Sequence, residues 1–105
     1  MKTVPFPPRD GIAAVRECLV AETRFEKMRG LLGRADLPDG VAMLLPGATL
    51  LHTVGMKFAL DIAFLGRDGR VVRVLRGVPP GRLFVWGGFR ARSALEARAG
   101  WLCRQ

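Results

Sequence analysis

The sequence predicts a mainly β (α+β) fold, in which a compact, barrel-like and mostly antiparallel sheet carries one clear short helix near residues 24–33. Three observations support this prediction. Short apolar runs rich in branched side chains recur along the chain, and Gly and Pro breaks separate them. The pair Asp68-Gly69 between two such runs is typical of a tight hairpin turn. Residues 23–33, in contrast, place apolar side chains at helical spacing.

The strands are expected where apolar side chains alternate or form short runs. The central strand lies in the run His52–Leu65, which we divide at Gly55–Phe58 into a site wall and a structural strand, residues 59–65. Residues 94–100 stay open between a helix, which their composition favours, and an extension of a strand. Further strands are predicted in residues 12–20, 41–45, 50–53, 71–75 and 83–86.

The helix begins at a capping box. The side chains of Thr23 and Glu26 can each satisfy a backbone amide that the first turn leaves without a partner. Gly33 is placed to end the helix in a left-handed conformation. We expect the apolar stripe of this helix to pack in the core rather than to hold a cofactor; it consists of Phe25, Met28, Leu31 and Leu32.

Length and composition indicate one soluble domain. We expect residues 1–11 to form an extended proline-rich arm and residues 12–105 to form the domain. Half of the residues are hydrophobic, which excludes the disordered class. No apolar run reaches the roughly 18 residues of a transmembrane helix, and residues 1–8 lack the apolar centre of a signal peptide. The expected location is therefore the cytoplasm.

The two cysteines, Cys18 and Cys103, lie near opposite ends of the chain. Without a signal peptide they are expected to be free thiols, with Cys18 acting as a small buried hydrophobic residue. A single histidine and two distant cysteines give no zinc-ligand spacing. We therefore expect neither a metal nor a cofactor.

The net charge of +8 comes almost entirely from arginine. Such a surface attracts phosphates and acidic partners. The arginines are scattered, however, so nucleic acid remains a minority hypothesis. Residues 83–89 interleave aromatic side chains with the flanking Arg82 and Arg90, a pattern that could stack bases but that core packing explains as well.

Several motifs, taken in order and spacing, resemble a known family over roughly residues 14–100. They lie in residues 29–34, 43–46, 52–53, 56–57, 60–65, 68–72, 78–80, 94–96 and 99–100. Together they resemble domain of unknown function family 192 (DUF192, also uncharacterised protein family 0127). The positions assigned to its structural motif are Arg29, Gly30, Gly33, Arg34, Asp68 and Gly69. The resemblance implies a compact, mainly β, barrel-like domain with one or two short helices and without an established activity.

Three departures from this family bear on the site. Ala59 stands where relatives usually have proline, and Gly55 stands where many have a bulky aromatic residue, which should open space beside His52. Relatives also usually continue beyond the position of Ala99-Gly100 with a helix and a closing strand. We therefore expect the last strand to be missing or to be supplied by a second copy, as in a homodimer.

Two polar residues in the central run are candidates for chemistry. Asp61, flanked by apolar neighbours, needs a cation or several donors if it is buried. A structural role, with an arginine partner such as Arg29, Arg34 or Arg82, is favoured over catalysis. His52 is the only histidine, and nine positions separate it from Asp61, or about 30 Å along a continuous strand. A catalytic pair would require the chain to turn between them.

The leading hypothesis is a non-enzymatic module that binds an unknown small ligand or protein partner. Its candidate binding residues are His52, Thr53, Met56, Lys57, Asp61 and Arg82. No residue is assigned as catalytic, and whether the protein is an enzyme stays open, with the balance against it. One alternative is a small hydrolase or lyase that uses Asp61 and His52. Another is arginine-mediated binding of nucleic acid or an anionic surface.

Overall fold

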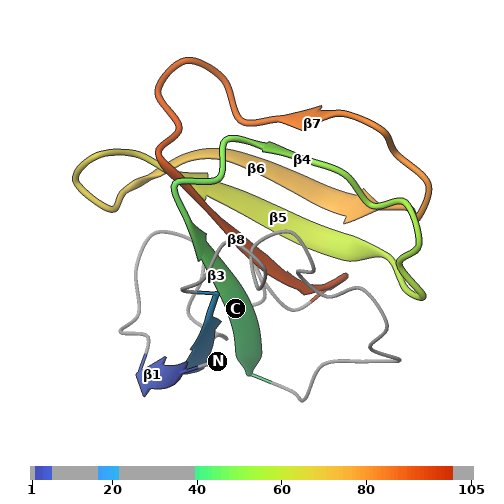
Figure 1. Cartoon of the computed structure of the whole chain (residues 1–105), viewed down its shortest axis with the longest axis horizontal. Coiled ribbons are helices and arrows are strands. Elements are labelled where there is room, and N and C mark those ends of the chain that lie inside the picture. Colours follow the sequence, from blue (N-terminus) through green and yellow to red (C-terminus); the bar gives the residue numbers. More distant parts are fainter. Residues whose placement is uncertain (1, 6–16, 22–39, 101–105) are drawn as a thin grey trace.

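The computed structural model describes residues 2–5, 17–21 and 40–100. This part of the chain is built from strands, and Figure 1 shows how they cross one another. In chain order the strands are β1 (Lys2–Pro5), β2 (Glu17–Val20), β3 (Val41–Pro46), β4 (Leu50–Leu51), β5 (Leu60–Leu65), β6 (Val71–Val78), β7 (Val85–Trp86) and β8 (Ser93–Arg98). No helix lies in the described residues, and therefore none that could span a bilayer.

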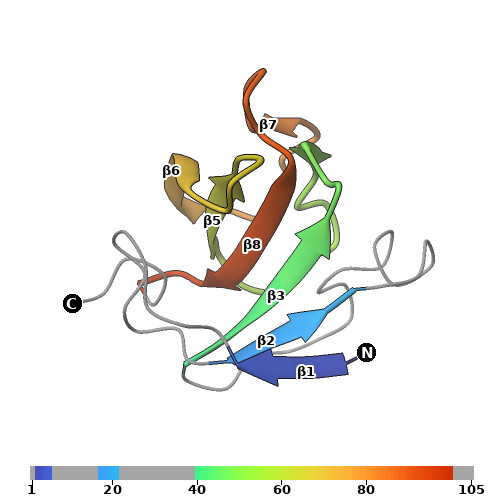
Figure 2. The same cartoon turned by 90° about the vertical axis from the view of Figure 1, so that its left-hand side faces the viewer.

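The strands form a larger sheet with the order β1-β2-β3-β8-β5-β6 and a smaller sheet of β4 and β7. The pair β2–β3 is parallel, and the other pairs in the described part are antiparallel. Figure 2 shows that the larger sheet is strongly curved, with β4 and β7 at the end far from β1. The prediction of a mainly β, mostly antiparallel and compact fold is confirmed.

The barrel-like part of that prediction needs correction. Within the described residues, β1 and β6 are the edges of the larger sheet and do not pair with each other, so the sheet is curved but open. The helix predicted near residues 24–33, and with it Arg29, Gly30, Gly33 and Arg34, lies outside the described residues.

The segment for which the sequence did not decide between a helix and a strand contains most of β8. This strand pairs with β3 on one side and with β5 on the other. Pairing on both sides satisfies its backbone groups and buries Ala94, Leu95, Glu96 and Ala97. This gain outweighs the small helix preference of Ala, Leu and Glu.

Alternating side chains give the larger sheet two apolar faces. Leu60, Ile62 and Phe64 of β5 pack on one face together with Leu51 of β4 and Val85 of β7, so the smaller sheet covers this face. The other face carries a second cluster, which contains Cys18, Ala42, Ala63, Leu95 and Ala97. The predicted burial of Cys18 is confirmed.

The β5–β6 hairpin turns where Asp68-Gly69 indicates. The amide of Gly69 donates to the carbonyl of Gly66 at 3.0 Å, and the amide of Arg70 donates to Asp68 Oδ1 at 3.0 Å. Gly69 has a φ of 82°, a left-handed conformation that glycine adopts without strain. Nearer the start of β5 the register shifts between Leu60 and Ile62, which marks an irregularity in β6.

Candidate functional site

Thr53, just after β4, joins two loops. Its side chain is fully buried, and its Oγ1 donates to the carbonyl of Pro79 at 2.7 Å while accepting from the amide of Arg82 at 2.9 Å. Its backbone amide donates to the carbonyl of Arg82 at 2.8 Å, and its carbonyl accepts from the amide of Gly81 at 2.9 Å. These bonds hold the loop between β6 and β7 in a fixed shape.

A groove lies between β6, this loop and β7. It has a volume of about 380 Å³. Its described lining is basic and partly aromatic and includes no acidic residue; the described residues are Arg73, Leu75, Arg76, Gly77, Val78, Pro79, Arg82, Phe84, Val85 and Trp86. The side chains of Arg73, Arg76 and Arg82 are exposed. We call this site the β6–β7 groove.

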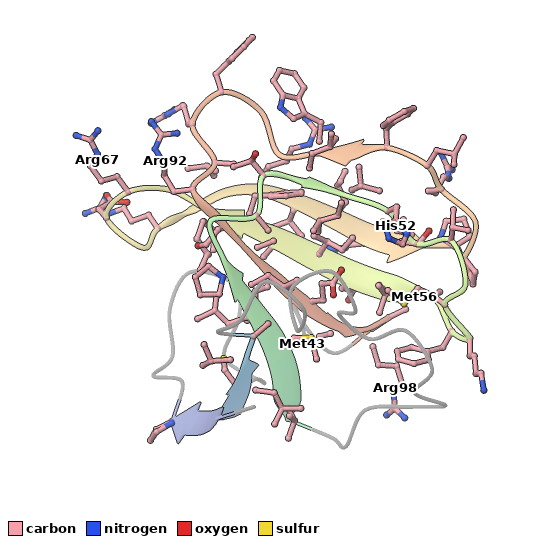
Figure 3. All side chains as sticks on the ribbon, viewed as in Figure 1. Met43, His52, Met56, Arg67, Arg92 and Arg98 are labelled. Carbon is pink, nitrogen blue, oxygen red and sulfur yellow. The ribbon has the colours of Figure 1, made fainter. Side chains whose placement is uncertain are left out.

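Aromatic rings stand exposed along the β7 segment. Phe84 is 77% exposed, Trp86 48% and Phe89 88%. The rings of Trp86 and Phe89 meet edge to face, with their centroids 4.8 Å apart. Figure 3 shows side chains of this segment projecting away from the sheets. We call these three residues the aromatic ridge.

A second groove, of about 390 Å³, lies beside the hairpin turn. Its lining is again rich in arginine and includes Phe89; the residues are Gly66, Arg67, Asp68, Val72, Phe89, Arg90 and Arg92. Figure 3 shows Arg67 and Arg92 at the same end of the molecule. Asp68, the one acidic residue that the described part of the chain contributes to this lining, forms an ion pair with Arg70 at 3.4 Å. We call this site the hairpin groove.

Asp61 is buried in β5 and accepts hydrogen bonds from backbone amides. Its Oδ1 accepts from Gly77 and its Oδ2 from Gly100, both at 2.8 Å. Two backbone amides thus donate to this carboxylate, for which an arginine partner was predicted from the sequence. Both glycines have positive φ, 63° for Gly77 and 91° for Gly100. Because Gly77 lines the β6–β7 groove, Asp61 fixes one side of that groove from behind.

The structure brings together only some of the candidate binding residues. Thr53 and Arg82 are bonded to each other. Met56 is buried in the cluster that contains Leu60 and Ile62, whereas Asp61 alternates with these residues and points to the other face of β5. His52 and Lys57 are exposed. His52 and Met56 belong to the chain segment that joins β4 to β5, and Figure 3 shows both at the same end of the molecule. In the described part no hydrogen bond joins His52 to Asp61.

Glu96 is a buried polar residue that was not among the site residues predicted from the sequence. It lies in β8 opposite Met43 of β3 and Ile62 of β5, and it is 98% buried. Burial raises the pKa of its carboxyl from 4.5 to about 7, and its Oε1 has no hydrogen-bond partner among the residues that the structure describes. The sequence feature that could have indicated this buried acid is a single glutamate among Ala and Leu in residues 94–97.

The site predicted from the sequence did not include Arg73, Arg76, Phe84 or Trp86. The sequence does contain a pattern that could have indicated these residues, because arginine recurs at positions 70, 73 and 76 and aromatic residues follow Arg82. Across the described residues, no three His, Cys, Asp or Glu side chains gather closely enough to hold a metal ion.

The open curved sheet and its two basic grooves define a small, mainly β domain. The chain belongs to the DUF192 family, described as an uncharacterized ACR, whose model matches residues 8–105. Among curated proteins, none matches the chain.

Two solved structures share the fold. A protein of unknown function from Novosphingobium aromaticivorans DSM 12444 is 25% identical, with a TM-score of 0.73 over 82% of this chain. This chain spans 64% of the length of that protein. A protein from Sinorhizobium meliloti 1021, described as a candidate transcription regulator, is 20% identical, with a TM-score of 0.76 over 84% of this chain and 72% of its own.

Proposed function

We propose that the protein is a non-enzymatic binding module whose β6–β7 groove holds an anionic ligand. The observation that carries this proposal is the convergence of Arg73, Arg76 and Arg82 on one groove, to whose lining the described residues contribute no acidic side chain. Three cations brought together, with no carboxylate of the described residues in the same groove, repel one another, and an anion relieves this repulsion.

The residue types suit phosphate or carboxylate groups. The guanidinium group of arginine presents a rigid fork of donors that matches the oxygens of both. The exposed rings of Phe84 and Trp86 add faces on which a planar part of a ligand, or an arginine, can stack. A ligand with a negative group and a flat apolar part would therefore use most of the lining.

The groove is organised before a ligand arrives. Thr53 fixes the loop that carries Arg82, and Asp61 fixes Gly77 beneath the groove. A preformed site loses less conformational entropy on binding, so more of the contact energy appears as affinity. Thr53 and Asp61 thus act as positioning residues, and of the residues selected from the sequence Arg82 faces the ligand.

Hydrolysis by Asp61 and His52 is not favoured. Each oxygen of the Asp61 carboxylate already accepts a backbone amide, and Asp61 faces away from the cluster that contains Met56. A general base must reach the proton that it abstracts, and a carboxylate held in this way is oriented toward the backbone.

Isothermal titration calorimetry with inorganic tripolyphosphate tests the proposal. We expect binding at low salt that weakens as salt rises, and a loss of about tenfold in affinity for Arg76→Gln and for Arg82→Gln. Arg70→Gln is the matched control, because Arg70 is exposed and ion-paired to Asp68 outside the groove. Equal affinities for all three variants, or no binding by the wild type, would overturn the proposal.

A further inference from the structure

The β6–β7 groove and the hairpin groove are two ends of one surface. The segment from Arg82 to Arg92 borders both: Phe84 and Trp86 line the first groove, and Phe89 lines the second. The contact between the rings of Trp86 and Phe89 bridges them. The arginines of the first groove, the aromatic ridge and the arginines of the second groove therefore form one continuous surface, which we call the track.

The backbone holds this track against the core. A side chain at Gly87 would lie 2.3 Å from the buried ring of Phe64 and 2.7 Å from Ala91 Cβ, so only glycine lets the chain approach so closely. The amide of Gly87 donates to the carbonyl of Thr49 at 2.9 Å, and the amide of Arg92 donates to the carbonyl of Leu65 at 2.7 Å. The exposed rings thus stand on a fixed base.

Positive charge flanks the rings on both sides. Arg73, Arg76 and Arg82 line one groove, and Arg67, Arg90 and Arg92 line the other. One guanidinium nitrogen of Arg92, Nη1, donates to the carbonyls of Phe89 and Ala91 at 3.2 and 2.9 Å, which braces the turn beneath Phe89. Among the described residues that line the two grooves, Asp68 is the only one with a carboxylate, and that carboxylate is paired with Arg70.

We infer that this track binds single-stranded nucleic acid, an inference that rests on the proposed anion-binding function of the first groove. Phosphates would contact the arginines while unpaired bases stack on Phe84, Trp86 and Phe89. Stacking requires bases with a free face, so a single strand is favoured over a duplex. The two hollows on either side of the ridge suit a narrow strand better than the flat surface of a bilayer.

The size of the molecule sets the length of the probe. The longest dimension of the fold is 30 Å. Aromatic and basic grooves of comparable small domains cover on the order of 4–16 nucleotides. A fluorescein-labelled oligothymidylate of roughly 12 nucleotides is therefore a suitable probe for fluorescence anisotropy.

The decisive variant is Phe89→Ala, because Phe89 lies outside the β6–β7 groove. We expect Phe89→Ala to weaken oligothymidylate binding by about tenfold and to leave tripolyphosphate binding unchanged. The variant Phe89→Tyr keeps an aromatic ring and should bind oligothymidylate as the wild type does. Leu83→Ala is the matched control, since Leu83 is 69% exposed in the same segment but lines neither groove. Arg90→Gln is expected to weaken oligothymidylate binding and to flatten its dependence on salt.

Each result decides between the two proposals. Tripolyphosphate binding without oligothymidylate binding, or oligothymidylate binding that Phe89→Ala does not change, would overturn the nucleic-acid inference and leave the anion groove in place. Absence of both would overturn both. Binding to phosphatidylglycerol vesicles that Leu83→Ala weakens, without oligothymidylate binding, would make this surface a membrane contact and overturn the inference. Thermal unfolding of each variant verifies that it is folded.

Discussion

Thr53 and Arg82 are joined by reciprocal hydrogen bonds: the Thr53 amide donates to the Arg82 carbonyl at 2.8 Å, and Thr53 Oγ1 accepts from the Arg82 amide at 2.9 Å. The two residues are 29 positions apart in the sequence. Through this pair, the end of β4 sets the path of the loop that lines the β6–β7 groove. The exposed guanidinium group of Arg82 thus depends on a hydroxyl that is wholly buried.

We expect Thr53→Val to destabilise the protein by about 2 kcal/mol, because it leaves the Pro79 carbonyl and the Arg82 amide without their partner. It should also weaken tripolyphosphate binding, since the loop is no longer fixed. Urea unfolding and calorimetry measure the two effects. Thr53→Ser keeps the hydroxyl and should retain the affinity. If Thr53→Val bound as tightly as the wild type, Thr53 would have no role in positioning the groove.

Asp61→Asn tests the structural role of that carboxylate. Asparagine offers one acceptor oxygen in place of two, so its amide group must face the N–H of either Gly77 or Gly100. We expect a loss of about 2 kcal/mol in the free energy of unfolding, measured by urea denaturation.

Asp68→Asn is the control for that change, because Asp68 lies in the exposed hairpin turn. We expect it to alter stability by less than about 0.5 kcal/mol. If both variants were equally stable, the two backbone bonds of Asp61 would contribute little to the fold.

Glu96 should make stability depend on pH. Its pKa is about 7 in the folded protein and 4.5 without burial, so between these values the folded state keeps a proton that the unfolded state has lost. The free energy of unfolding therefore falls as pH rises through this window, by about 3 kcal/mol in total, and this contribution is constant above pH 7.

The difference between wild type and Glu96→Gln isolates this effect, because glutamine has no charge to bury. Urea unfolding at several pH values should show a shallower fall for Glu96→Gln than for the wild type, with the variant gaining most at alkaline pH. Parallel curves for the two proteins would mean that the buried carboxyl does not titrate in this range.

The sequence predicted the strands whose pattern is local. β3, β5 and β6 fall on apolar runs, and the hairpin turn falls on Asp68-Gly69. The strand β8 could not be decided, because Ala and Glu favour a helix and only its two neighbours make it a strand. The openness of the sheet was also not predictable, since it depends on which edges meet in space.

Part of the site could not be predicted from the sequence, and the reason is geometric. Residues three apart in a regular strand point to opposite faces, yet Arg73 and Arg76 both line the β6–β7 groove. The register shift beside Leu75 and Val78 accounts for this change of side, and no local pattern indicates it. The donors to Asp61 were missed because backbone amides carry no signature in a sequence.

The position of β8 in the sheet determines when the sheet can complete its folding. It is the last described strand in the chain, but it lies between β3 and β5 in the sheet. While the chain emerges from the ribosome, β3 and β5 each have one edge whose backbone groups stay unpaired until β8 has been synthesised. Folding is therefore expected to be late and slow, as is usual when contacts are distant in sequence. Shortened chains that end before Ser93 should aggregate through those two edges.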